Sequence, residues 1–147
     1  MAYVYYPVMM AMMVSPGANY YKDCGSRTGA IESLTISGCL DSLNVCTLRR
    51  GSTADIAIQF KSATDSNTVT ASVMGQLYGV EIPFPLDNMD GCQSGVTCPI
   101  IIGQSYTYQK SIQIQSYYPP TNVNVKFQLK DDNSNNIVCA LITAKVV

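Results

Sequence analysis

The number and spacing of the cysteines constrain this chain more than any other feature of its sequence. None of the six lies in a C-x-x-C motif, which argues against zinc ribbons and thioredoxin-type redox sites. An even number that includes two close pairs, C-x6-C and C-x5-C, indicates three disulfides formed in an oxidising compartment. Fifteen pairings are possible, and local loop closure favours two short bridges and one long one. The favoured pairs are Cys39–Cys46, Cys92–Cys98 and Cys24–Cys139.

The remainder of the chain has the pattern of short strands separated by turns. Residues 54–60 (ADIAIQF) and 122–130 (NVNVKFQLK) alternate in side-chain type, as half-buried antiparallel strands do. No stretch sustains a helical period. Further strands are expected near 31–36, 68–78, 106–114 and 137–146. About seven strands at this spacing predict an all-β, immunoglobulin-like β-sandwich, in a single domain over residues 19–147.

One predicted strand contains a charge on its apolar side. In 106–114 the even positions are apolar or aromatic except for Lys110. A lysine is costly to bury without a partner. We therefore expect a bulge or an open sheet edge near Lys110 rather than a charge in the core.

Histidine is absent, which excludes Ser-His-Asp and Cys-His catalysis and histidine-containing zinc sites. With two glutamates in the whole chain, the sequence is poorly equipped for catalysis and we expect no enzyme activity. A net charge of −1 provides no electrostatic footprint for nucleic acid.

Two pairs of aspartates could be read as catalytic carboxylates or as a calcium site. Asp87 with Asp90, and Asp131 with Asp132, lie among Asn, Ser and Gly. In such segments aspartate ordinarily forms turns by accepting hydrogen bonds from its own backbone. No EF-hand spacing is present. We interpret all four as turn residues and expect no metal site.

Residues 1–18 differ from the rest in composition. Five of the seven methionines fall there, and the apolar run VMMAMMV precedes SPGA. The run is too short to span a bilayer and resembles the hydrophobic region and cleavage zone of a signal peptide. No Lys or Arg precedes it, and a disordered segment is the alternative. A signal peptide predicts a secreted protein, which we expect to be soluble because no later apolar run approaches about 18 residues.

Two aromatic residues lie on stiffened loops. Phe84 stands between Pro83 and Pro85, and Tyr118 directly precedes Pro119 and Pro120. Proline fixes its own backbone and restricts the residue before it. Each aromatic residue is therefore held at a strand end, where it either packs in the core or lines the mouth of a ligand pocket.

Longer patterns resemble the ML lipid-recognition family, and within it the Niemann–Pick type C-two sterol carriers, especially those of arthropods. The likeness extends over nearly all of residues 20–147. It rests on YKDCGS at 21–26, GVEIPFPLDNMDGC at 79–92, SGVTCPI at 94–100, YTYQKSIQIQSYYP at 106–119 and FQLKDDN…VCALI within 127–142.

The resemblance implies a sandwich whose sheets part to enclose an apolar lipid tunnel, with the disulfide pairing favoured above. It places a sterol-contacting aromatic on Phe84, an aliphatic lining residue on Ile114 and the tyrosine of the Y-P motif on Tyr118. Further lining positions implied by the resemblance are Ile56, Val73, Ile82, Val123 and Val125.

The implied function is a secreted, non-enzymatic carrier that binds and transfers a sterol, a fatty acid or a similar hydrophobic molecule, semiochemicals included. A lipid-sensing immune-recognition module that presents microbial lipid to a protein partner is the alternative. A membrane receptor or an acceptor membrane would take part in lipid hand-off. We expect a monomer without cofactor or nucleic-acid partner.

Two departures from the family pattern bear on location and ligand. No Asn-x-Ser/Thr sequon is present, which disfavours glycan-dependent delivery to the lysosomal lumen and favours secretion. The 39–46 loop is longer than in the vertebrate carriers, and no tryptophan lies near Phe127. Ile114 in place of a smaller residue, together with other changes in the implied lining, leaves the choice of ligand open.

Overall fold

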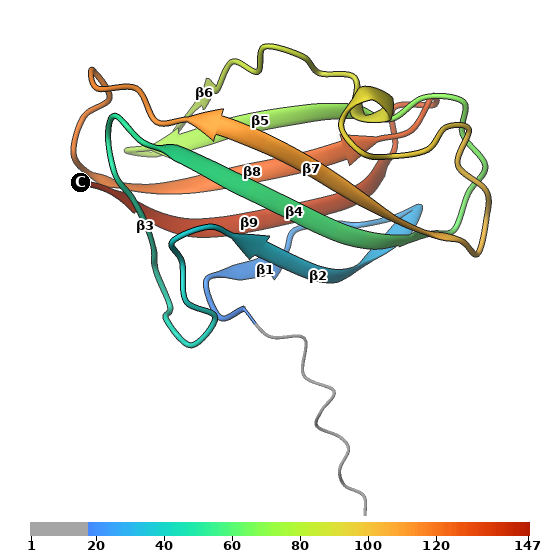
Figure 1. Ribbon diagram of the computed structural model, residues 1–147, viewed down its shortest axis with the longest axis horizontal. Helices are drawn as coiled ribbons and strands as arrows, with labels where there is room; N and C mark the ends of the chain where they lie inside the picture. Colours follow the sequence, from blue (N-terminus) through green and yellow to red (C-terminus); the bar gives the residue numbers. More distant parts are fainter. Residues whose placement is uncertain (1–17) are drawn as a thin grey trace, which may run out of the picture.

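The computed structural model describes residues 18–147, which form two β-sheets packed face to face (Figure 1). The larger sheet has the order β1-β9-β8-β5-β6, and β3 pairs in parallel with β9. The smaller sheet has the order β2-β4-β7. The strands are β1 (Tyr21–Asp23), β2 (Gly29–Ile36), β3 (Cys46–Leu48), β4 (Thr53–Ser62), β5 (Thr70–Leu77), β6 (Val80–Pro83), β7 (Ser105–Gln113), β8 (Asn122–Lys130) and β9 (Asn136–Val146).

The predicted immunoglobulin-like sandwich is confirmed. The six long strands lie where the alternation of residues places them, and the described part adds three short ones, β1, β3 and β6. Each short strand has three or four residues, which is too few for a period of two to stand out. No helix in this part of the chain is long and apolar enough to cross a membrane.

The core lies between the two sheets and is closed by large side chains at one end. Phe60 of β4 and Leu129 of β8 are fully buried there. Tyr108 of β7 meets Phe127 of β8 edge to face, with ring centroids 5.5 Å apart. This aromatic pair therefore links the inner faces of the two sheets, and we call this half of the sandwich the packed end.

The favoured disulfide pairing is confirmed. Bridges join Cys24 to Cys139, Cys39 to Cys46 and Cys92 to Cys98. The first ties β1 to the beginning of β9, and the second closes the loop that leads into β3. Both bridges therefore lie along one edge of β9, because β1 and β3 both pair with the edge that β8 leaves open.

Two of the four aspartates act as turn residues, as predicted. The Asp131 carboxylate accepts hydrogen bonds from the backbone N–H groups of Asn133 and Asn135. Asp90 accepts from the N–H of Cys92, at the start of the short 3₁₀ turn η3 (Gly91–Gln93). Asp132 instead accepts from the N–H of Asn67, which lies 65 residues earlier in the chain, so its carboxylate links two loops. The fourth, Asp87, forms an ion pair instead, which is described below.

The expectation for Lys110 is half right. The pairing of β4 with β7 runs without a register shift from Thr53↔Gln113 to Lys61↔Ser105, so the predicted bulge is wrong. β7 is nevertheless at the edge of the smaller sheet. An edge strand lets the lysine leave the apolar interior without interrupting the ladder. The signal peptide predicted at the amino terminus falls on residues outside the described part, apart from Ala18.

Candidate functional site

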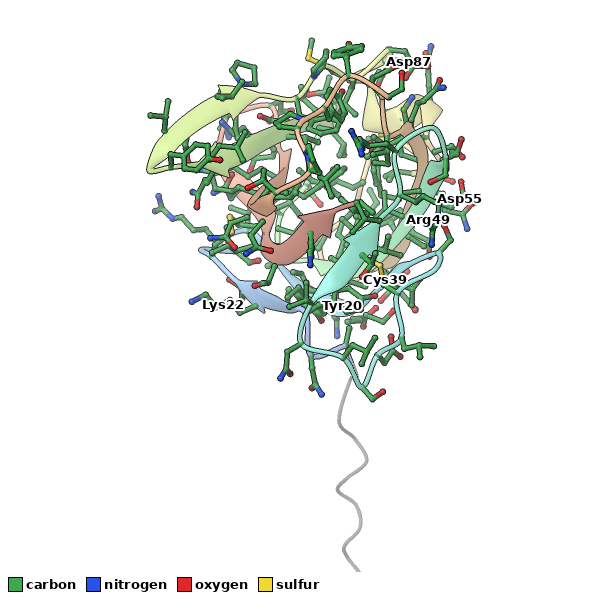
Figure 2. All side chains as sticks on the ribbon, turned by 90° about the vertical axis from the view of Figure 1, so that its left-hand side faces the viewer. Tyr20, Lys22, Cys39, Arg49, Asp55 and Asp87 are labelled. Carbon is green, nitrogen blue, oxygen red and sulfur yellow. A yellow bond between two sulfur atoms is a disulfide. The ribbon has the colours of Figure 1, made fainter. Side chains whose placement is uncertain are left out.

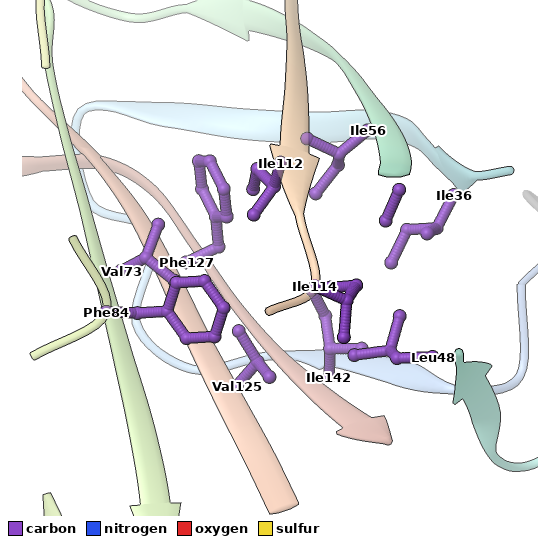
Figure 3. Close-up of a pocket in the computed structure, with 11 residues that line it drawn as sticks. Ile36, Leu48, Ile56, Val73, Phe84, Ile112, Ile114, Val125, Phe127 and Ile142 are labelled. Atoms are coloured by element: carbon purple, nitrogen blue, oxygen red, sulfur yellow. The ribbon is translucent and has the colours of Figure 1, made fainter. Parts of the chain in front are cut away.

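A small apolar cavity lies between the sheets and borders the packed end at Phe127. We call it the inner cavity, and its volume is about 40 Å³. It is formed where β4 begins and β7 ends, opposite the middle of β5 and β8 and the second half of β9 (Figure 3). Its walls are entirely hydrocarbon. They comprise Ile36, Leu48, Ala54, Ile56, Val73, Phe84, Ile112, Ile114, Val125, Phe127 and Ile142.

Phe84 is held at the wall of this cavity by its own backbone. β6 ends at Pro83, and the N–H of Phe84 then donates to the carbonyl of Val73 on β5, at 2.9 Å. In Figure 3 the ring points from this loop toward Val125 and the interior. The ring also meets Tyr118 edge to face, with centroids 5.2 Å apart. Burial, and to a lesser degree the neighbouring Tyr117, raises the pKa of the Tyr118 hydroxyl.

A second apolar hollow lies on the other side of Phe84. This outer hollow has a volume of about 300 Å³. Its walls are Gly75, Leu77, Ile82, Pro83, Phe84, Pro85, Tyr118, Pro119, Thr121, Val123 and Val146. Phe84 lines both spaces, and we call its ring the partition between the inner cavity and the outer hollow. We call the half of the sandwich that contains both spaces the open end.

The residues singled out from the sequence are divided by this partition. Ile56, Val73, Ile114 and Val125 line the inner cavity, whereas Ile82, Val123 and Tyr118 line the outer hollow. The predicted set therefore contains two groups of residues, with Phe84 common to both. The sequence analysis did not single out Ile36, Leu48, Ala54, Ile112, Phe127 or Ile142 as lining residues. Ile112, Phe127 and Ile142 occupy inward positions of predicted strands, and this alternation could have identified them; Leu48 lies in β3, which the pattern missed.

The rim of the outer hollow carries exposed apolar side chains. Tyr78 and Tyr117 are 89% and 77% exposed, and Val80 and Ile82 of β6 are also exposed. Tyr78 and Gly79 form the tip of the β5–β6 hairpin with positive φ angles of 51° and 78°. This is the pattern of a tight hairpin turn, which glycine accommodates at its second position.

Two ion pairs involve carboxylates that lie within three residues of Phe84 in the chain, Glu81 and Asp87. Lys126 Nζ lies 2.7 Å from Glu81 Oε2, outside the larger sheet, and this hydrogen bond lowers the pKa of Glu81. Lys110 Nζ lies 2.6 Å from Asp87 Oδ1, and hydrogen bonding to the lysine likewise lowers the pKa of Asp87. Both carboxylates therefore remain charged at neutral and mildly acidic pH.

The site offers an apolar enclosure rather than a reactive group. No cluster of three or more His, Cys, Asp or Glu side chains that could hold a metal occurs within residues 18–147. Hydrocarbon walls can take up an apolar molecule by removing its surface from water. The chemistry that this arrangement supports is binding.

Comparisons with known proteins agree with this geometry. The ML domain family model matches residues 18–146. NPC intracellular cholesterol transporter 2 homolog a of Drosophila melanogaster is 37% identical over 137 residues, which cover 92% of this chain and 93% of that protein. NPC intracellular cholesterol transporter 2 of Mus musculus is 34% identical over 95% of this chain and 93% of its own length.

A solved structure shows the same fold. The Niemann-Pick type C2 protein from Japanese carpenter ant superposes with a TM-score of 0.82 at 27% sequence identity. The match covers 86% of this chain and 98% of the ant protein.

Proposed function

The chain belongs to the ML domain family, and from this premise we propose that it is a lipid carrier that binds and releases its ligand unchanged. The ligand is a sterol, a long acyl chain or another hydrophobic molecule of similar size. Relatives named as cholesterol transporters support the sterol and lipid class. Three disulfides support residence in an extracellular or lysosomal compartment, and we propose secretion as the simpler of the two.

The observation that carries the proposal is the hydrocarbon cavity, whose lining shares Phe84 with the outer hollow. All residues that line the inner cavity are apolar, and a hollow of about 300 Å³ continues it beyond Phe84. Burying apolar surface contributes about 25 cal/mol per Å², reduced by the cost of ordering the ligand. An extended apolar molecule would gain this energy along both spaces.

Binding requires that the open end widens. Pockets for ligands of this size occupy about 300–1,000 Å³, which exceeds the inner cavity of about 40 Å³. Displacing the Phe84 ring joins the inner cavity to the outer hollow. The Phe84–Tyr118 contact joins loops rather than paired strands, so its loss would break no strand pairing. The sheets then part around the ligand while the packed end stays closed.

Direct identification of bound lipid tests this function. The protein is purified from a secreting host, analysed by native mass spectrometry and extracted for lipid identification. We expect a mass increment that organic extraction removes, and uptake of a fluorescent sterol or fatty acid by the extracted protein with release of the unchanged probe.

Two results would contradict the carrier function. One is a delipidated protein, folded by circular dichroism, that takes up neither probe. The other is hydrolysis of ester or amide probes that copurifies with the protein, which would indicate an enzyme.

A further inference from the structure

Lys110 faces the apolar interior of the sandwich but ends at its edge. It pairs directly across the sheet with Ile56, and Ile112 follows two residues later on the same face. Both isoleucines line the inner cavity. The Lys110 side chain is only 12% exposed. The lysine therefore leaves β7 next to residues that line the cavity, and its ammonium lies at the Asp87 carboxylate.

The partner of Lys110 has the opposite surroundings. The Asp87 side chain is 84% exposed, and Figure 2, which looks at the open end, shows it on the outer rim of the molecule. Asp87 follows Phe84 by three residues, on the loop that must move when the partition opens. Its carboxylate loses little hydration in the ion pair and returns to water at small cost. The ammonium, in contrast, is costly to leave without an acceptor.

A second polar group on this face of β7, unlike Lys110, has no partner among the described residues. The Tyr108 hydroxyl is buried and forms no hydrogen bond to any residue among 18–147. Tyr108 precedes Lys110 on the inward side of β7. Burial, and secondarily the charge of Asp87, raises the pKa of Tyr108 to about 12. The hydroxyl therefore remains a hydrogen-bond donor at any physiological pH.

From these observations we propose that Lys110 recognises the carboxylate of an acyl-chain ligand, and that Asp87 occupies this position until the ligand displaces it. The inference rests on the lipid-carrier function and narrows its ligand class to long-chain carboxylates. The acyl chain enters the cavity beyond Phe84, and its carboxylate replaces that of Asp87 on the Lys110 ammonium. One charged hydrogen bond is exchanged for another, so the buried ammonium always has an acceptor. Neutral lipids of the same length bind without this exchange.

Matched probes test the head-group preference. Oleate and oleyl alcohol share a chain and differ in the head group. Their dissociation constants are measured at neutral pH, below the concentration at which oleate forms micelles, by displacement of a fluorescent probe. Wild type is expected to prefer oleate severalfold, because the exposed Asp87 carboxylate that the ligand displaces returns to water at small cost. Lys110→Met should reduce the ratio to about one by lowering oleate affinity alone.

The Asp87→Asn variant tests whether the Asp87 carboxylate competes with the ligand for Lys110 or only holds its loop in place. Removing the competing carboxylate should raise oleate affinity severalfold and leave oleyl alcohol unchanged. If the ion pair only held the loop, Asp87→Asn and Lys110→Met would instead shift both probes in the same direction. Lys126→Met is the matched control, because Lys126 forms an ion pair of similar length outside the larger sheet. It should leave the ratio at the wild-type value.

The outcomes distinguish failure of the proposed role of Lys110 from failure of the lipid-carrier function on which it rests. Equal ratios in wild type and Lys110→Met, with both probes bound, would overturn the role of Lys110 and leave the carrier intact. Failure of wild type to bind either probe or a sterol would overturn the carrier itself. Lys110→Gln, with urea midpoints for every variant, provides a second test if Lys110→Met is poorly folded. Asp87→Asn changes an exposed side chain, and its effect on oleate affinity tests the carboxylate exchange without relying on any Lys110 variant.

Discussion

Phe60 and Phe84 are both phenylalanines of a β-sandwich core, and they differ in what surrounds them. Phe60 lies at the packed end, fully buried in β4 and in contact with Tyr106, whose ring centroid is 5.9 Å away. Phe84 lies at the open end, half-buried on a loop between two apolar spaces. The same side chain is a filled core position in one place and a partition in the other.

The difference shows how one sandwich combines stability with adaptability. At the packed end the space between the sheets is filled by side chains, and close packing resists deformation. At the open end the apolar walls are only partly filled, so side chains there have fewer protein contacts to lose. Stability should therefore depend on the first end and ligand affinity on the second. The following experiments test that division.

The largest effect is expected from the disulfides. Cys24–Cys139 closes a loop with a sequence separation of 115, whereas Cys39–Cys46 spans 7. In the chain-entropy model the two bridges contribute about 5 and about 2 kcal/mol respectively. The double serine variant at Cys24 and Cys139 should lower the free energy of unfolding in urea by about twice as much as that at Cys39 and Cys46. Equal losses would show that native contacts rather than loop closure decide the difference.

The paired phenylalanine variants test the division directly. Phe60→Ala should cost about 3–5 kcal/mol of unfolding free energy because it leaves a void in a filled core. Phe84→Ala should cost much less in the lipid-free protein. It should lower lipid affinity tenfold or more, about 1.4 kcal/mol or above, because the ring contacts ligand. Tyr118→Ala should behave like Phe84→Ala.

Urea midpoints of the lipid-free proteins and titration with a fluorescent sterol or fatty acid measure both quantities. An unfolded Phe84→Ala variant whose folded fraction binds lipid with wild-type affinity would make Phe84 an ordinary core residue. In that case the partition would have no role in binding.

A smaller effect is expected from two strand glycines. A Cβ at Gly29 would lie 2.9 Å from the carbonyl oxygens of Lys61 and Ile137, and neither backbone can move away easily. A Cβ at Gly75, in the wall of the outer hollow, would meet Val123 Cγ2 at an ordinary 3.6 Å. Gly29→Ala should therefore cost about 1–3 kcal/mol, and Gly75→Ala should be neutral or stabilise by up to about 1 kcal/mol. Thermal unfolding of both variants measures this difference, and a destabilised Gly75→Ala would indicate that the open end is packed as tightly as the other.

Much of the fold could be predicted from the sequence because it depends on local patterns. Alternation in 122–130 correctly identified β8 and its inward face. Loop closure correctly favoured the short bridges, because cysteines six or seven residues apart have few other partners within reach. The short strands β1, β3 and β6 could not be predicted, since they exist through pairing with β9 or β5 rather than through their own residues.

The sequence by itself determined which side chains face inward and where the backbone is stiff. It placed Ile56, Val73 and Val125 on inner faces and Phe84 between two prolines. Only the tertiary structure decided how deep each inward residue lies, because a period of two specifies a face and not what stands opposite it. That depth separates the inner cavity from the outer hollow and from the packed end. The edge position of β7 was decided in the same way, by which strands pair, and it brings Lys110 to Asp87 across 23 residues of sequence.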